Sequence, residues 1–261
     1  MQKSITFHKY HGTGNDFILI DSFHKDIKLS PEIIQQICNR RFGVGADGLI
    51  ILRKADTFDF CMDFYNSDGK PGTMCGNGGR CIVAFAHYLG IISEKTTFLA
   101  PDGVHEAFYY NHEKISLKMS DVASFEQHKK GLFFDTGSPH LVILKTSKDT
   151  FNVYSEGKEI RYSSAYMPNG TNVNFLTTDK KIPEIFTYER GVENETFSCG
   201  TGAVAASLAL NITNNIASPV TLKSKGGLLK ISFTTHANNS FSDIWLEGPA
   251  INVFSGTYII G

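Results

Sequence analysis

The sequence predicts an α+β protein made of two copies of one unit, each with β-strands around a buried helix. Three observations predict this fold. Apolar and alternating runs typical of strands recur along the 261 residues. Two Cys-Gly turns, "MCGNGG" and "SCGTGA", each precede an apolar segment. Cys199 follows Cys75 by 124 positions, and the strand runs before each cysteine come in the same order. Such a repeat is typical of duplication, although two β-rich halves can also resemble each other by chance.

The expected strands are recognised by alternation or by β-rich composition. Residues 58–65 alternate apolar and polar side chains, as do the segments around Leu117 and Ile231. Shorter β-rich runs lie at 17–20, 49–52, 141–144, 172–176 and 185–188, and a last strand is expected near 251–260. Gly14-Asn15 corresponds to Gly137-Ser138 at an offset of 123, so the repeat extends beyond the cysteines.

Three helices are expected. Ser30 and Pro31 are typical of an N-cap and a first helical residue, and this helix is predicted to reach about Arg41 and stop at Gly43. The other two, at 79–89 and 203–212, follow the Cys-Gly turns. The segment 203–212 is apolar on every side, which indicates a buried helix.

Composition narrows the functional classes. The formal net charge is -1 and no basic run occurs, so nucleic acid is not expected as a partner. No apolar run approaches the length of a membrane span, and the N-terminal residues lack the apolar centre of a signal peptide. Five cysteines, an odd number, favour reduced thiols in the cytoplasm over a disulfide framework. The length suits two domains, with the join expected in the polar stretch 121–131.

Each Cys-Gly turn places a thiol at the start of a helix. The helix dipole and the free N–H groups there favour negative charge, and cysteines in such positions have a lowered pKa. The glycines leave the backbone N–H groups open to an anionic ligand such as a carboxylate. If the two units face each other, Cys75 can remove a proton from one side of a carbon while Cys199 delivers one to the other side. The expected result is inversion of a stereocentre without metal or pyridoxal phosphate.

Other interpretations of the same residues remain open. A cysteine before a helix is most often a small buried residue. Cys75 and Cys81 have a spacing that is weak for zinc, and a redox dithiol favours C-x-x-C. The turn at Gly76 lacks the Gly-Lys-Ser/Thr of a phosphate-binding loop. Cys81 is expected in the core.

Five blocks of the sequence resemble the diaminopimelate epimerase family along essentially the whole chain. They are "HGTGNDFILID", "RRFGVGADGLI", "DFYNSDG…MCGNGGRC", "TGSPHLV" and "YERGVENETFSCGTGA". The resemblance implies two pseudo-symmetric domains, each a curved, mostly antiparallel sheet around a central helix, with the active site in the cleft between them. The implied domains are 1–120, completed by 250–261, and 121–249. It further implies a cytoplasmic homodimer that interconverts LL- and meso-diaminopimelate without a cofactor, for lysine and peptidoglycan precursor synthesis.

The resemblance also assigns roles to residues. It implies catalytic roles for Cys75 and Cys199 as the acid/base pair, with Glu189 and His140 assisting. The implied substrate-binding residues are Asn15, Asn66, Gly76, Asn77, Asn172, Glu189, Arg190, Gly200 and Thr201. Structural alternatives exist: Asn15 and Asn66 can cap their own turns, the Glu-Arg pair can be a solvated face, and His140 can be a turn histidine.

The chain departs from the family pattern at three places. Ser138 stands where the family usually has Asn, Gly48 stands where some members have Gln, and the loop at 191–196 is one residue longer. The nearest alternative function is that of another cofactor-independent racemase, such as a proline or hydroxyproline racemase, although Asn77 stands where those enzymes typically have His. An alternative of another class is a non-catalytic amino-acid-binding or thiol redox protein.

Overall fold

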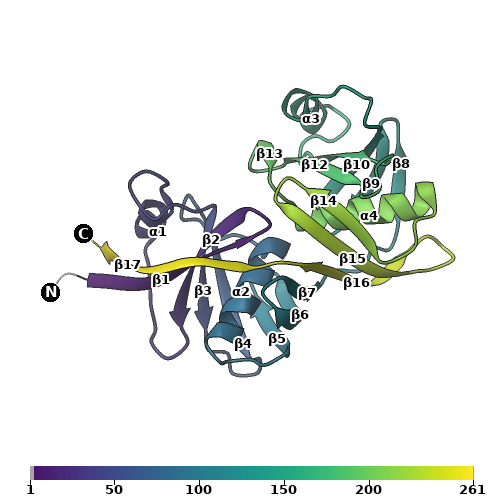
Figure 1. The fold of residues 1–261 in the computed structure, drawn as a ribbon. Coiled ribbons are helices and arrows are strands. Elements are labelled where there is room, and N and C mark those ends of the chain that lie inside the picture. Colours follow the sequence, from purple (N-terminus) through teal and green to yellow (C-terminus); the bar gives the residue numbers. More distant parts are fainter. Residues whose placement is uncertain (1–2, 261) are drawn as a thin grey trace. The chain divides into compact units, whose positions relative to one another are not determined.

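A computed structural model describes residues 3–260, and this part of the chain divides into two compact units (Figure 1). The first unit contains 3–117 and 248–260, and the second contains 118–247. The polar stretch 121–131, where the join was expected, lies inside the second unit and contains a strand. None of the helices in the described range is long and apolar enough to cross a membrane. The proposed domains remain 1–120 together with 250–261 for the first, and 121–249 for the second.

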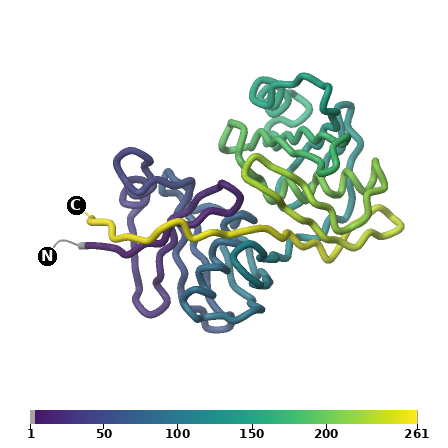
Figure 2. The backbone as a smooth tube through the Cα atoms, viewed as in Figure 1, coloured from purple at the N-terminus to yellow at the C-terminus, as the bar shows by residue number. Residues whose placement is uncertain are grey.

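The first unit is built on eight strands in the order β17–β1–β2–β3–β4–β5–β6–β7. The C-terminal β17 runs antiparallel to β1, so the two ends of the chain lie side by side in one sheet (Figure 2). Two helices, α1 and α2, provide the crossovers between parallel neighbours. The elements are β1 (Lys3–Gly12), β2 (Asn15–Ser22), α1 (Pro31–Cys38), β3 (Gly48–Arg53), β4 (Phe60–Asn66), α2 (Gly76–Tyr88), β5 (Lys95–Ala100), β6 (Gly103–Asn111), β7 (Lys114–Lys118) and β17 (Ile251–Ile260).

The second unit repeats this plan. Its strands follow the order β8–β9–β10–β11–β12–β14–β15–β16, and the short β13 pairs with β12. The elements are β8 (Phe125–His128), β9 (Gly131–Asp135), β10 (Pro139–Lys145), α3 (Val153–Arg161), β11 (Asn172–Thr177), β12 (Glu184–Glu189), β13 (Asn194–Thr196), α4 (Gly200–Asn214), β14 (Val220–Ser224), β15 (Gly227–Thr235) and β16 (Phe241–Gly248).

The pairing pattern confirms the predicted duplication. From β1 to β7 the neighbouring strands are antiparallel, parallel, antiparallel, parallel, antiparallel and antiparallel. The same series runs through β9, β10, β11, β12, β14, β15 and β16. The helix α2 precedes β5 and α4 precedes β14, so the two helices that follow the cysteines occupy equivalent positions. The α+β class with two pseudo-symmetric domains is therefore confirmed.

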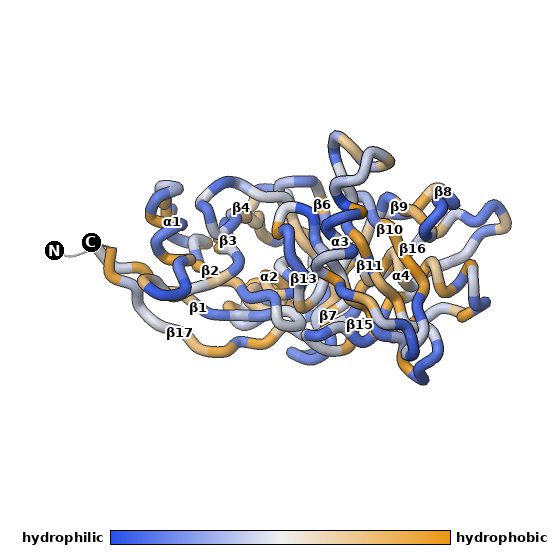
Figure 3. Tube along the Cα trace, turned by 90° about the horizontal axis from the view of Figure 1, so that it is seen from above, coloured by the Kyte–Doolittle hydropathy of each residue, from blue (hydrophilic) through white to orange (hydrophobic). Residues whose placement is uncertain are grey.

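The two equivalent helices form the centre of each unit. Eleven consecutive residues of α2, Gly76–Ala86, are buried. The α4 residues Ala203–Leu210 are also all buried, and hydrophobic residues colour much of α4 orange in Figure 3. A helix that is apolar on every side cannot be left against water, so the strands must surround it. Cys81 is completely buried in α2, as expected.

The helix boundaries differ from the sequence-based ones for identifiable reasons. Both central helices begin earlier than predicted, at the glycine directly after each cysteine, because the cysteine itself is the N-cap. The helix α1 ends at Cys38 rather than near Arg41, since the side chain of Asn39 accepts the N–H groups of Arg41 and Phe42 and turns the chain.

The helix α3 was missed. Its sequence, VYSEGKEIR, is short and contains a glycine, and only Val153 and Ile160 supply apolar side chains to its buried face. Its start is stabilised by the side chain of Asn152, which accepts the N–H of Ser155, while Glu156 accepts the N–H of Asn152. Its inner face packs on the sheet, where a Cβ at Gly157 would lie 2.4 Å from the Cβ of Tyr188.

This contact gives a test of the fold. Helix propensity alone predicts that Gly157→Ala gains about 1 kcal/mol. Overpacking against Tyr188 costs about 1–3 kcal/mol, so we expect a net loss of stability. Urea unfolding measures the difference, with Ser155→Ala on the exposed side of α3 as the control, expected within about 0.5 kcal/mol of the parent. A stabilised Gly157→Ala variant would contradict this packing.

Candidate active site

The first thiol lies at the N-terminus of α2. Cys75 is the N-cap, and its Sγ accepts the backbone N–H of Gly78 at 3.2 Å. A Cβ on Gly78 would lie 3.3 Å from this Sγ and 3.3 Å from Cδ1 of Ile50. The glycine therefore allows the thiol to sit directly over the first turn of the helix, where the N–H groups favour an anion.

A chain of side-chain amides surrounds this thiol. Arg80 donates to Oδ1 of Asn77 at 3.0 Å, and Nδ2 of Asn77 donates to Oδ1 of Asn15 at 3.2 Å. Nδ2 of Asn15 donates to Asp47 at 2.7 Å. Arg80 can only donate and an ionised Asp47 can only accept, so the two ends fix the orientation of both amides. Oδ1 of Asn15 consequently faces the thiol, 4.0 Å from Sγ of Cys75.

Arg80 is a buried cation beneath this turn. Its guanidinium donates to the carbonyls of Gly76 and Pro249 and to Oγ1 of Thr13, in addition to Asn77. Burial lowers its pKa to about 10, so it stays charged at neutral pH. Because these four acceptors are neutral oxygens, they do not neutralise the positive charge of Arg80. This charge acts on Cys75 and the residues around it, which we call the first half-site; the residues around Cys199 form the second half-site.

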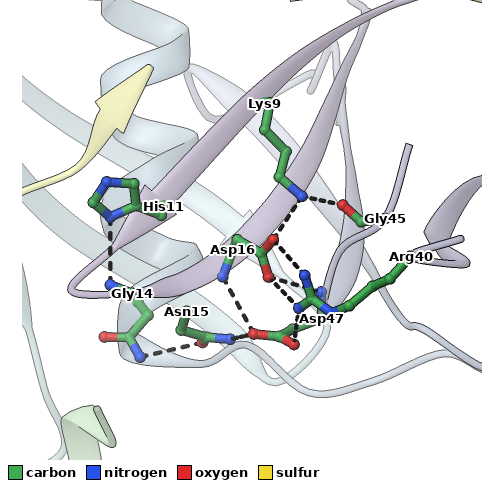
Figure 4. A network of polar contacts seen from close by, with 9 residues as sticks. Lys9, His11, Gly14, Asn15, Asp16, Arg40, Gly45 and Asp47 are labelled. Carbon is green, nitrogen blue, oxygen red and sulfur yellow. Dashed lines mark hydrogen bonds and ion pairs between the residues drawn. The ribbon is translucent and has the colours of Figure 1, made fainter. Parts of the chain in front are cut away.

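An ion-pair network holds the other end of the amide chain (Figure 4). Arg40 binds both carboxylate oxygens of Asp16 and also contacts Asp47. Lys9, nearly buried, pairs with Asp16 at 2.6 Å and donates to the carbonyl of Gly45. Burial alone would raise the pKa of Asp16, but hydrogen bonds and charges from Arg40 and Lys9 outweigh it and hold the pKa well below the usual value. The network keeps Asp47 in place to accept from Asn15.

Asn66 lies apart from these contacts, at the exposed end of β4, opposite Gly48 of β3. Its backbone N–H donates to the carbonyl of Lys70. A Cβ on Gly48 would approach the Tyr65 carbonyl to 2.8 Å and the Phe64 ring to 2.9 Å. The departure from the family pattern at this position therefore has a steric reason: this backbone has no room for a larger residue.

The second thiol lies at the equivalent helix start. Cys199 is the N-cap of α4, but its side chain makes no capping hydrogen bond. Its Sγ lies 3.4 Å from Oγ1 of Thr201, whose backbone carbonyl accepts the hydroxyl of Thr136. The Gly202 Cα faces the amide of Asn174, because a Cβ there would lie 2.6 Å from Oδ1 of Asn174.

His140 lies beneath Thr201 and is completely buried. Its Nε2 is 2.9 Å from Oγ1 of Thr201 and 3.0 Å from Oγ of Ser138, while Nδ1 receives Nδ2 of Asn174 at 3.1 Å. Burial lowers the pKa of His140 to about 3, and the positive charge of Arg190 lowers it further. His140 is therefore neutral at physiological pH.

The remaining predicted residues of this unit surround His140. Asn172 accepts the backbone N–H of Arg190 at 2.8 Å and donates to the Pro139 carbonyl at 2.9 Å. Glu189 accepts the hydroxyl of Thr196, and the Arg190 guanidinium donates to the Asn169 carbonyl. The amide of Asn172 thus fixes the backbone that carries Arg190.

Sequence reasoning missed four residues that orient these groups: Arg80, Asp47, Asn174 and Ser138. Arg80 and Asp47 lie inside the quoted blocks, but charged residues beside glycine turns are usually exposed and gave no separate signal. Ser138 was noted only as a departure from the family pattern, yet it contacts both His140 and Asn172. Asn174 is a polar residue within an apolar strand run, the kind of interruption that marks a buried network.

Comparison with known proteins identifies the family. A family model described as diaminopimelate epimerase matches residues 7–124 and 132–251. The chain belongs to the diaminopimelate epimerase family. A diaminopimelate epimerase from Flavobacterium psychrophilum is 48% identical over 253 residues, covering 96% of this chain and 98% of the relative. One from Chlorobaculum tepidum is 43% identical over 259 residues, covering 94% and 98%.

Solved structures show that the fold is shared more widely than this epimerase family. A phenazine biosynthesis protein from Bacillus anthracis superposes with a TM-score of 0.78 at 14% identity, covering 99% of this chain and 100% of that one. A hydroxyproline epimerase from Agrobacterium vitis superposes with a TM-score of 0.66 at 14% identity, covering 100% and 94%. At these identities the similarity shows the fold alone.

The burial of His140 predicts a pH effect on stability. The pKa of His140 is about 3 in the folded state, whereas an unfolded histidine titrates near 6.5. Below pH ~6.5 the unfolded chain binds a proton that the folded chain does not, so stability is complete above this pH and falls toward pH 3. The limiting slope is about 1.4 kcal/mol per pH unit.

Urea unfolding between pH 7.5 and 4.5 measures this slope. The parent is expected to lose more stability on acidification than His140→Gln, which lacks the titrating ring. NMR of the folded parent should show no titration of the His140 ring above pH 5. Equal slopes, or a ring that titrates near pH 6.5, would disprove the neutral buried state.

Proposed function

We propose that the protein interconverts LL- and meso-2,6-diaminopimelate by a two-base mechanism in which Cys75 and Cys199 exchange the α-proton. Membership of the family, together with relatives of that name at 48% and 43% identity over almost the whole chain, supports the activity. The single observation that supports the mechanism is the equivalence of the two thiols, each the N-cap of a buried helix in a duplicated unit.

In this mechanism the two half-sites act on opposite faces of one α-carbon. One cysteine, as a thiolate, takes the α-proton, and the other, as a thiol, donates its proton to the opposite face. Charge that develops on the substrate carboxylate is stabilised by the N–H groups at the starts of α2 and α4. After one turnover the protonation states of the thiols are exchanged, so the reverse reaction uses the same pair.

The proposed substrate contacts follow from the two half-sites. In the first unit they are Asn15, Asn66, Gly76 and Asn77, and in the second they are Asn172, Glu189, Arg190, Gly200 and Thr201. Arg190 suits a carboxylate, which it can bind with two hydrogen bonds, and Glu189 suits an ammonium group. His140 is proposed to act from beneath the site rather than by proton transfer, since its ring is neutral and buried.

We further propose a cytoplasmic homodimer that serves lysine and peptidoglycan precursor synthesis, with no cofactor in the reaction. The hydroxyproline epimerase structure shares the fold, and a proline-type racemase is therefore the competing activity. Asn77 favours diaminopimelate, because its amide is fixed by Arg80 and Asn15 in a way that a histidine ring would not reproduce. A non-catalytic binding protein is the competing function of another class.

Incubation with LL-diaminopimelate in D2O tests the activity. We expect the meso isomer to form with deuterium at one α-carbon, as shown by mass spectrometry and proton NMR. L-proline and trans-4-hydroxy-L-proline serve as competing substrates under the same conditions. Absence of deuterium exchange with diaminopimelate, with and without reductant, would refute the proposed function. Faster turnover of either proline substrate than of diaminopimelate would identify the protein as a proline-type racemase instead.

Substitution of each cysteine tests the two-base mechanism. Cys75→Ala and Cys199→Ala should each lose epimerisation by about 100-fold or more, the scale for removal of a general acid or base. Cys61→Ala, on strand β4 and outside both half-sites, is the matched control and should retain parental turnover. If either helix-start variant turned over at the parental rate, two thiols would not be required.

A further inference from the structure

We propose that Asn174 is a positioning residue that fixes the tautomer of His140 and thereby directs the hydroxyl of Thr201 toward Sγ of Cys199. The series Asn174–His140–Thr201–Cys199 is called the second-unit relay below. The hydrogen-bond geometry of this series does not depend on which substrate is bound. Its effect on catalysis rests on the proposed function of Cys199.

The orientation of the Asn174 amide is fixed at two points. Nδ2 donates to the carbonyl of Leu141 at 3.1 Å, and that oxygen can only accept. Oδ1 accepts the hydroxyl of Thr187 at 2.9 Å. The remaining contact of Nδ2, at 3.1 Å, is with Nδ1 of His140. An amide nitrogen cannot accept a hydrogen bond, so Nδ1 is the acceptor and carries no proton.

A neutral His140 with an unprotonated Nδ1 must carry its proton on Nε2. Its neighbours there are the hydroxyls of Thr201 and Ser138, which accept. Nδ2 of Asn172 also lies 3.5 Å from Nε2, but its two protons go to the Pro139 carbonyl at 2.9 Å and to Oγ of Ser138 at 3.3 Å. Because Nε2 is protonated, the Thr201 hydroxyl cannot donate to it and must donate elsewhere. Sγ of Cys199, at 3.4 Å, lies within reach of that proton, and Ser138 is the other neighbour at 3.5 Å. Ser138 already receives Nδ2 of Asn172 at 3.3 Å, which favours Cys199 as the acceptor.

The duplicated first unit shows that the fold does not require this polar series. Strand pairing aligns Phe17 with Gly48 and His140 with Asn172, which makes Phe17 and His140 equivalent positions. By the same registers Ile50 corresponds to Asn174. Ile50 pairs with Phe64 and Asn174 pairs with Thr187, so Phe64 and Thr187 are also equivalent positions.

The first-unit residues Phe17, Ile50 and Phe64 are buried and apolar, whereas their second-unit counterparts are buried and polar. The packing role is the same in both units: a Cβ on Gly78 would contact Ile50, and one on Gly202 would contact Asn174. Buried polar groups cost free energy unless they are hydrogen-bonded. Three of them in one cluster, where apolar residues suffice for the fold, indicate a role in the site.

The second-unit relay provides Sγ of Cys199 with a hydrogen-bond donor, as the helix cap does for Sγ of Cys75. Sγ of Cys75 receives the N–H of Gly78, whereas Sγ of Cys199 makes no capping bond. A hydroxyl that donates to sulfur stabilises the thiolate relative to the thiol. The tautomer of His140 therefore favours the base form of Cys199, and Asn174 sets that tautomer from a position that does not touch the sulfur.

The tautomer itself is measured by 15N NMR of protein labelled at histidine, with His140→Gln used to assign the signal. We expect the Nε2–H pattern in the parent and an Nδ1 proton in Asn174→Asp, where a carboxylate replaces the amide donor. Thr187→Val removes a hydrogen bond to Asn174 but not the donor to His140, and should keep the Nε2–H pattern. An Nδ1 proton in the parent, or an unchanged tautomer in Asn174→Asp, would overturn the proposal.

The catalytic consequence is measured by kinetics on diaminopimelate. Asn174→Asp and Thr201→Val should each lower kcat about tenfold or more, the loss expected for a hydrogen bond to a charged group, with KM nearly unchanged. Thr201→Ser, which keeps the hydroxyl, should restore kcat. The double variant should be no slower than either single variant, since both changes break one series. Ser207→Ala, which removes a buried hydroxyl elsewhere in α4, is the control for unspecific loss and should keep parental kcat.

The two experiments separate the possible failures. Losses that multiply in the double variant, or no rescue by Thr201→Ser, would overturn the relay while leaving the epimerase function intact. Absence of α-proton exchange in the parent would remove the proposed function, whereas the NMR result would still decide the tautomer.

Discussion

The position of a cysteine as the N-cap of a largely buried helix is the constraint on which the rest of the structure depends. Because residues Gly76–Ala86 of α2 and Ala203–Leu210 of α4 are buried, strands surround both helices, and glycines leave the backbone open at their N-terminal ends. The same end carries the unpaired N–H groups and the positive pole of the helix. One arrangement thus provides the fold with a core and the site with a thiol next to anion-binding groups.

The two units use this arrangement with different support. In the first, charged residues at both ends of an amide chain, Arg80 and Asp47, orient Asn77 and Asn15 around Cys75. In the second, the equivalent positions hold Thr201 and Ser138, and the support comes from below through His140 and Asn174. Duplication therefore preserved the helix and the thiol, while the residues that tune each thiol diverged. In the proposed mechanism each thiol acts on a different face of the substrate, which is compatible with such unequal halves.

Much of the fold was predictable because its signals are local. Alternation identified β4, β7 and β15, β-rich composition identified β2, β3, β10, β11 and β12, and the repeat of Cys75 at Cys199 identified the duplication. The helix α3 was not predictable in this way, since its apolar repeat is short and it depends on capping by Asn152 and on close packing of Gly157 against Tyr188. The predicted site residues of each unit came from the resemblance, whereas Arg80 and Asn174 are recognisable only once strand pairing brings distant segments together. Orientation of an amide or of an imidazole proton depends on partners that no spacing in the sequence encodes.

The central claim is that two different thiols act on the two faces of one carbon. The most direct test is the location of deuterium early in the reaction in D2O, before much product has formed. Product and unreacted LL-diaminopimelate are separated and analysed by mass spectrometry. The account predicts deuterium at the inverted carbon of the product and protium in the recovered substrate, because the thiol that removes the proton is not the one that delivers it. Deuterium in the recovered substrate at the same level as in the product would mean that one base serves both faces, and would contradict the account.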